Sequence, residues 1–232
     1  MTLLGVLTAF AVLGGLVLVA VLFMQRGRDG VDLSIGGLLR AYLYLGSLAG
    51  IVVFAVGIAG MLSYVLAAGF GLDVIYGGPV PQPATPTPVC PPNTVCPPIE
   101  VFRSPVDDRL RRQGEDLVRG GTFLIFGGVF WVAHWIARRN LGRADEALSG
   151  LYRAYLMLGT AIFGIATIAL LPMGIYQALS FAVIPSGPNV YYRPGAGDAL
   201  SGGLAALPIW LAYLWLVLQT IRMTPRTPST VA

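Results

Sequence analysis

The chain has 232 residues, of which 56% are hydrophobic and 11% are charged, and its mean hydropathy is +0.74. This is more apolar surface than one soluble core can bury, so the composition excludes an ordinary soluble domain and predicts an all-α integral membrane protein. The net charge of +4 comes from fifteen Arg and no Lys, which gather at predicted helix ends rather than in one basic run. That distribution argues against nucleic-acid binding and leaves the lipid bilayer, and other membrane proteins, as the expected partners.

The first predicted transmembrane helix occupies residues 2–24, which are apolar throughout and are followed by Arg26 and Arg28. At about 1.5 Å per residue this run spans a hydrocarbon core of roughly 30 Å. A cleaved signal peptide would begin with basic residues and have a shorter apolar core, so we expect a retained helix. Residues 1–34 therefore form a helix and linker, with the N-terminus outside and the linker in the cytoplasm.

A second apolar run extends from about Ile35 to Ala68, which is longer than a bilayer requires and predicts a tilted or projecting helix. Arg40 and Tyr42 mark the point at which this helix enters the membrane. Four glycines share one helical face and predict close packing within the chain, with a dimer motif as the alternative: Gly46, Gly50, Gly57 and Gly60.

An outer region is predicted at 69–116, and its first part is rich in Pro and nearly free of charge. Such a composition is typical of an extended loop. Cys90 and Cys96 lie in this loop, and the oxidising outer compartment favours a disulfide between them, with free thiols as the alternative.

The end of the outer region carries a helix-start signal, because Ser104 is followed by Pro105 and by Asp107. Acidic and basic residues then recur at i, i+4 and predict a solvated amphipathic helix: Asp107 with Arg111, Asp108 with Arg112, and Glu115 with Arg119. A surface that docks a partner is the alternative interpretation.

The third predicted helix, 117–139, holds Trp131, His134 and Trp135 near its cytoplasmic end. His134 is the single His of the chain and has two interpretations. It can anchor the helix end and hydrogen-bond a neighbouring helix, or it can ligate the metal of a haem or pigment, which would be the only cofactor. One His excludes a bis-His haem within one chain, and we expect no other metal site.

A fourth helix is predicted from 150 to about 183 and a fifth over 198–223, with a cytoplasmic tail at 224–232. Arg153 and Tyr155 repeat the Arg and Tyr found at the start of the second helix, and Trp210 and Tyr213 lie near the end of the fifth. We expect Arg40 and Arg153 to anchor the topology, and an anionic-lipid site is their functional alternative.

The sequence repeats itself, because GLLRAYLYLG at 37–46 and GLYRAYLMLG at 150–159 agree at eight of ten positions. WVAHW at 131–135 is echoed by WLAYL at 210–214, so His134 corresponds to Tyr213. We therefore predict five transmembrane helices with a duplicated two-helix unit, at 35–148 and 149–223. Two crossings per unit make the copies parallel, related by an axis along the membrane normal. Nine Arg fall on the predicted cytoplasmic side and six outside.

The RAYLYL start at 40–45 and the GVFWVAHW segment at 128–135 resemble a family of bacterial multi-pass membrane proteins. That family carries a domain of unknown function built from such helix pairs. The resemblance covers residues 36–223 and departs from the pattern at Tyr213, which stands where the first copy has His134. It implies the architecture and a bacterial cytoplasmic membrane, and it brings no activity.

The predicted spans contain no charged side chains, because Asp, Glu, Lys and Arg are absent from 41–68, 120–137, 154–184 and 199–221. Ion-coupled transport needs such groups, and no pairing of a nucleophile with a base is visible in the sequence. The leading hypothesis is a non-enzymatic accessory or scaffold subunit of a membrane complex. The alternatives are a transporter or channel component, and a haem- or pigment-binding subunit that uses His134.

Overall fold

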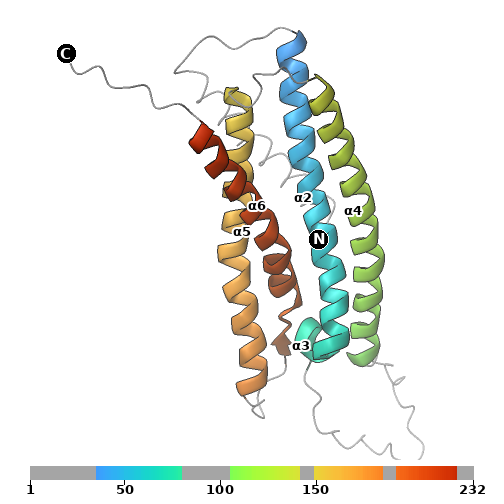
Figure 1. Cartoon of the computed structure of the whole chain (residues 1–232). Helices are drawn as coiled ribbons and strands as arrows, with labels where there is room; N and C mark the ends of the chain where they lie inside the picture. Colours follow the sequence, from blue (N-terminus) through green and yellow to red (C-terminus); the bar gives the residue numbers. More distant parts are fainter. Residues whose placement is uncertain (1–34, 80–104, 142–148, 185–191, 224–232) are drawn as a thin grey trace, which may run out of the picture.

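The computed structural model describes residues 35–79, 105–141, 149–184 and 192–223 (Figure 1). Four long helices make up nearly all of these residues: α2 (Ile35–Phe70), α4 (Pro105–Leu141), α5 (Gly150–Val183) and α6 (Gly197–Met223). Each is long and apolar enough to cross a membrane. The prediction of an all-α, multi-pass membrane protein is confirmed at this level. The predicted helix at 2–24 and the pair Cys90 and Cys96 lie outside the described residues.

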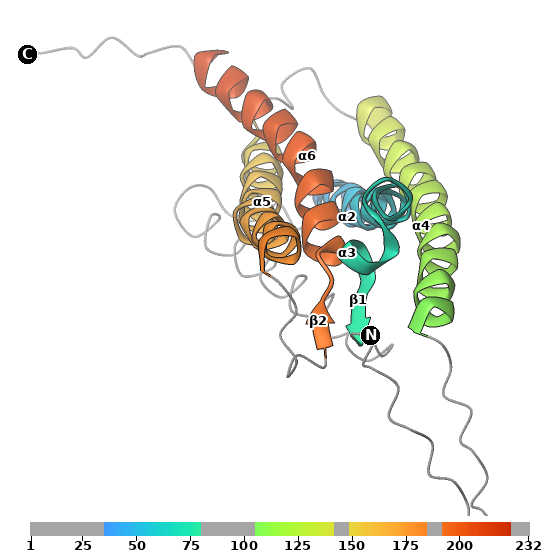
Figure 2. The ribbon, with the colours of Figure 1, turned by 90° about the horizontal axis from the view of Figure 1, so that it is seen from below.

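The helices form two antiparallel pairs, which we call hairpin 1 (α2 and α4) and hairpin 2 (α5 and α6) (Figure 1). Helices α2 and α5 run in one direction and α4 and α6 in the other. Seen along the bundle, α2 lies between α4 on one side and hairpin 2 on the other (Figure 2). Contact between the hairpins is made mainly by α2 against α6.

Helix α4 is longer than the third predicted span, because the charged segment from Pro105 continues without a break into the apolar segment that ends at Leu141. The predicted outer region 69–116 therefore ends in a helix from residue 105 onwards. Its ion pairs also differ from the predicted ones. Arg111 pairs with Glu115 at 3.3 Å instead of Asp107, and Arg119 pairs with the buried Asp116 at 2.5 Å instead of Glu115.

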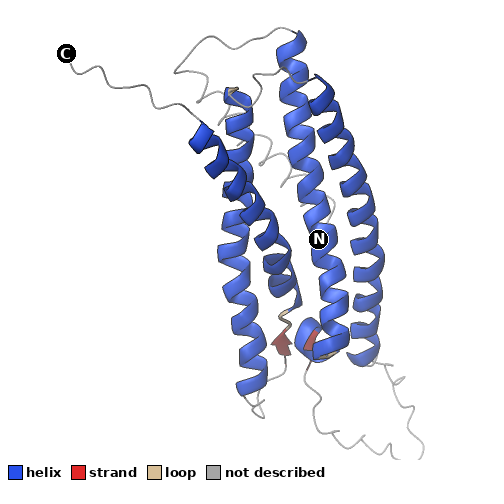
Figure 3. Cartoon of the chain, in the orientation of Figure 1, coloured by secondary structure: helices blue, strands red, loops and turns tan. Residues whose placement is uncertain are grey.

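A short helix and a strand follow α2 where the sequence predicted only extended loop. Gly71, at φ 95°, ends α2, and α3 (Leu72–Tyr76) and β1 (Gly77–Pro79) follow. Glycine adopts this backbone conformation without the strain that a side chain would add. Strand β1 pairs antiparallel with β2 (Tyr192–Pro194), the small ribbon coloured red in Figure 3. The ribbon joins the two hairpins at one end of the bundle.

Glycines set the distance between α2 and α4. The four glycines predicted to share a face are the ones that contact α4, meeting His134, Trp131, Leu124 and Gly120 in turn. A Cβ on Gly57 would overlap the backbone of Leu124. Such close approach maximises van der Waals contact in a bilayer, where lipid chains are as apolar as the side chains.

Candidate functional site

Polar side chains gather at the two ends of the bundle. At the end where α2 and α5 begin, tyrosines and His134 form a layer, which we call the tyrosine layer: Tyr42, Tyr44, His134, Arg138, Tyr155 and Tyr213. At the opposite end, beside the β-ribbon, lies a pocket, which we call the end pocket.

Within the tyrosine layer, Tyr213 donates a hydrogen bond from its hydroxyl to the Tyr155 hydroxyl at 2.6 Å. The Ser47 hydroxyl of α2 lies 3.4 Å from the same Tyr155 oxygen. All three side chains are buried. The bonds satisfy polar groups that water cannot reach and link α6 and α5 to α2.

His134 is buried between the helices of hairpin 1, with an exposed fraction of 8%. Its Nδ1 lies 2.8 Å from the Phe130 carbonyl oxygen and its Nε2 lies 3.4 Å from the Tyr42 hydroxyl. A carbonyl oxygen can only accept, so Nδ1 donates and Nε2 is left to accept from Tyr42. Both ring nitrogens are engaged, so a metal-centred cofactor would have to displace one of these partners.

The two hairpins place corresponding residues in corresponding contacts. The Tyr42 and His134 rings lie 5.5 Å apart in hairpin 1, and the Tyr155 and Tyr213 rings lie 5.5 Å apart in hairpin 2. Gly46 lies against the His134 ring, and Gly159 lies against the Tyr213 ring. The environments differ, because Tyr42 is exposed on the outside of the bundle whereas Tyr155 is buried between the hairpins.

The other residues predicted for the membrane interface divide into packing and surface positions. Trp131 stacks on Phe54 with ring centroids 6.2 Å apart, and the Trp210 indole lies against Gly164. Trp135 is exposed, and the Arg139 guanidinium lies over its ring, 5.3 Å from the ring centroid. Arg40 and Arg153 are half-buried at the starts of α2 and α5.

The end pocket has a volume of about 370 Å³ and lies where α3, α4, β2 and α6 meet. Its charged lining comes from Arg112, Glu115, Asp116, Arg119 and Asp198, with Tyr76 and Tyr192 as aromatic walls. Asp116 is buried and forms an ion pair with Arg119. The pocket thus presents both signs of charge to a partner or polar ligand.

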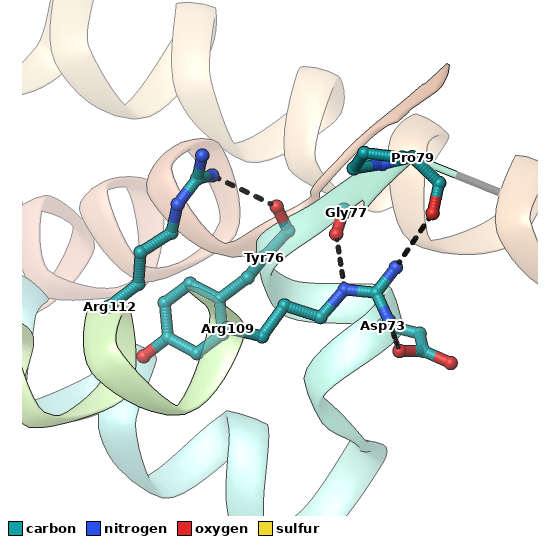
Figure 4. Close-up of polar contacts among 6 residues, drawn as sticks. All are labelled: Asp73, Tyr76, Gly77, Pro79, Arg109 and Arg112. Carbon is teal, nitrogen blue, oxygen red and sulfur yellow. Dashed lines mark hydrogen bonds and ion pairs between the residues drawn. The ribbon is translucent and has the colours of Figure 1, made fainter. Parts of the chain in front are cut away.

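Beside the end pocket, Arg109 holds the segment that carries the lining residue Tyr76 (Figure 4). Its Nε donates to the Gly77 carbonyl oxygen at 2.7 Å, its Nη2 donates to the Pro79 carbonyl oxygen at 3.2 Å, and its Nη1 pairs with Asp73. The guanidinium fork therefore holds α3 and β1 against α4. Arg112 adds a long contact, 3.5 Å, to the Tyr76 carbonyl oxygen.

The Tyr76 hydroxyl is buried beside the pocket and has no hydrogen-bond partner among the described residues. Burial raises the pKa of this hydroxyl well above its ordinary value, and the carboxylate of Asp116 raises it further. Tyr76 is therefore a neutral phenol at physiological pH, beside the Asp116 carboxylate.

No set of three or more His, Cys, Asp or Glu in the described part of the chain is arranged to hold a metal ion. The charged side chains of both signs that line the end pocket suit it to recognition by hydrogen bonds and charge pairing. This pocket could not be identified from the sequence, because its lining residues Tyr76, Arg112 and Asp198 are far apart in the chain. One available signal was the Gly77–Gly78 pair shortly after Asp73, which is typical of a tight turn.

Comparison of the chain with protein families, with curated proteins and with solved structures found no match.

Proposed function

We propose that this chain is a non-enzymatic accessory or scaffold subunit of a membrane complex, and that a partner engages it at the end pocket. The observation that carries the proposal is the contrast between the two kinds of polar group. Ser and Tyr hydroxyls within the spans bond to each other, whereas charged side chains of both signs line the end pocket.

The contacts inside the spans favour a structural role for the bundle. Ser63 of α2 donates to Ser201 of α6 at 2.8 Å, and Ser201 donates to the Gly197 carbonyl oxygen at 2.6 Å. No charged residue occurs in the central parts of the four spans. A transporter coupled to ions would need such a residue, so the scaffold is favoured over the transporter or channel alternative.

The contacts of His134 favour the anchor interpretation over the haem- or pigment-binding alternative. Both ring nitrogens already have partners, and the ring fills the space that Gly46 leaves on α2. These are the features expected of an interhelical polar contact.

We further propose that residues 35–148 and 149–223 are copies of one two-helix unit. The matching contacts of Gly46 with His134 and of Gly159 with Tyr213 support this, since both fall at positions paired by the sequence repeat. The parallel directions of α2 and α5 agree with it (Figure 1). With the helix predicted at 2–24, the chain then crosses the membrane five times.

The proposed location is a bacterial cytoplasmic membrane, with the N-terminus and end pocket outside and the C-terminus in the cytoplasm. The count of Arg over the whole sequence supports this orientation, with nine on the proposed cytoplasmic side against six outside. Five of the nine lie in the long helices, at the end of the bundle opposite the pocket: Arg40, Arg138, Arg139, Arg153 and Arg222. Cytoplasmic flanks of membrane helices carry an excess of such residues.

Purification from native membranes in mild detergent, followed by mass spectrometry and an absorption spectrum, tests the function. We expect a defined partner to co-purify with the wild type and with Arg139→Glu, whose change lies at the far end, and to be lost in Arg112→Glu at the pocket. A lone, colourless protein contradicts the scaffold proposal. A visible absorption band supports the pigment-binding alternative instead.

A further inference from the structure

Arg138 occupies an unusual position between the two hairpins. Its guanidinium carbon lies 4.8 Å from the ring centroid of Tyr44 on α2 and 4.8 Å from that of Tyr155 on α5. The cation is therefore held between two aromatic faces that come from different hairpins. Cation–π contact stabilises the charge, but it leaves the N–H donors without acceptors.

The charge of Arg138 is not neutralised by the rest of the described structure. The three ion pairs found there involve Arg109, Arg111 and Arg119. The Nη1 group of Arg138 is buried and has no hydrogen-bond partner in the described part of the chain. A buried N–H donor on a charged group destabilises the fold unless it is paired with an acceptor of opposite charge.

Arg153, at the same end of the bundle, also has a buried donor nitrogen that lacks an acceptor among the described residues. This nitrogen is its Nε, and Arg153 lies in the first turn of α5, two residues before Tyr155. Both residues are half-buried, so a ligand arriving from the end of the bundle meets their exposed parts, and the two covered nitrogens become donors to it once the side chains turn. Arg139 differs, because its side chain is exposed and lies over Trp135.

We propose that Arg138 and Arg153 bind a phosphate group between the hairpins. The fork of an Arg guanidinium matches phosphate oxygens in geometry and charge, and two such side chains supply the donors that the protein leaves unpaired. The bound anion stabilises the contact between α4 and α5, two helices that otherwise touch little. Lipid headgroups supply many phosphate groups at the membrane surface, where this end of the bundle is proposed to lie. Free phosphate offers the same acceptor oxygens and negative charge.

The test is the unfolding temperature of the full-length, delipidated protein in detergent, titrated with three probes. Short-chain phosphatidylglycerol carries the phosphate, a short-chain diacylglycerol lacks it, and inorganic phosphate carries it without a lipid. We expect phosphatidylglycerol to raise the unfolding temperature and diacylglycerol to leave it unchanged. An equal rise with inorganic phosphate identifies free phosphate as the source and supports the same site.

The matched variants are Arg138→Gln and Arg139→Gln, which remove one positive charge from adjacent positions. Arg138→Gln should weaken binding of the phosphate probe by roughly tenfold or more, the loss expected for a charged hydrogen bond, and Arg139→Gln should not. Equal affinity in Arg138→Gln and wild type, or no response to either phosphate probe, overturns the proposal. If Arg138→Gln does not fold, Arg153→Gln takes its place, and wild-type affinity in that variant is equally decisive.

Discussion

Two arginines near the start of α4 show how much the surroundings of one residue matter. The Arg109 side chain is 9% exposed and makes contacts with Asp73 and two carbonyl oxygens. Arg111 is 60% exposed, and its pair with Glu115 lies in solvent. Hydrogen bonds from a buried charged donor stabilise a fold far more than an exposed ion pair does.

We predict that Arg109→Gln lowers the free energy of unfolding by about 2 kcal/mol, because it removes charged hydrogen bonds from a buried site. Arg111→Gln, the matched control, should change it by less than about 1 kcal/mol. Denaturant unfolding in detergent measures both, and hydrogen exchange over residues 72–79 should quicken in the first variant alone. Equal effects of the two changes would count against the proposed role of Arg109.

His134→Gln should leave the protein folded and inserted, with a loss of about 1 kcal/mol or less, since interhelical polar contacts in membranes are worth little on average. Tyr213→Phe, at the corresponding position of hairpin 2, provides the comparison. Unfolding in detergent and the absorption spectrum are the measurements. An absorption band in the wild type that disappears in His134→Gln would contradict the anchor role.

The sequence could predict part of this residue-level chemistry. His134 and Tyr213 were identifiable because each lies near a helix end within an aromatic pattern that recurs in the chain. The partners of Arg109 were not, because no local rule relates it to Gly77 or Pro79, which residues 80–104 separate from α4 in the sequence.

At the scale of the element, hydropathy identified the helices well because each apolar run is long and bounded by charge or glycine. The predicted second helix, about 35–68, compares with Ile35–Phe70, and the predicted fifth, 198–223, compares with Gly197–Met223. The prediction did not include α3 and the β-ribbon. Their few residues are stabilised by contacts with distant segments, such as the bond from the Ala196 amide to the Val74 carbonyl oxygen, 2.8 Å.

The close approach of α2 and α4 gives a prediction about glycine. Gly57→Ala should destabilise the protein by about 1–3 kcal/mol, because the new Cβ meets the Leu124 backbone, which cannot move aside without separating the helices. Gly121→Ala in α4 meets no atom within 4 Å, so it should be neutral or slightly stabilising. The free energy of unfolding of both variants can be measured in a denaturing detergent. Similar losses in both variants would contradict the packing role of Gly57.

At the scale of the whole molecule, the hairpins present different faces to each other. Ser63 bonds to Ser201, whereas the residues that correspond to them in the repeat, Tyr176 and Thr122, are exposed. A two-fold axis along the membrane normal would place both pairs in the same environment, so the hairpins are not related by one. The proposed repeat alone could not predict this, because the choice of contacting face depends on residues that differ between the two segments.

Cross-linking tests this arrangement. In a background with Cys90→Ser and Cys96→Ser, the pair Ser63→Cys and Ser201→Cys should form a disulfide, since the two hydroxyl oxygens lie 2.8 Å apart. The pair Thr122→Cys and Tyr176→Cys should not. A protease site inserted within residues 142–148 provides the measurement, because the two halves stay linked after cleavage only if the disulfide has formed. The opposite pattern would contradict the observed contact between α2 and α6.

The most direct measurement is labelling of the two ends of α4 in intact cells. Asp107→Cys and Asn140→Cys place thiols at exposed positions near the two ends of this helix, again without the native cysteines. If α4 spans the membrane with the end pocket outside, a membrane-impermeant maleimide should label Asp107→Cys in intact cells. It should label Asn140→Cys only after the membrane is opened. Labelling of Asn140→Cys in intact cells would contradict the proposed topology, and with it the presentation of the end pocket to an outside partner.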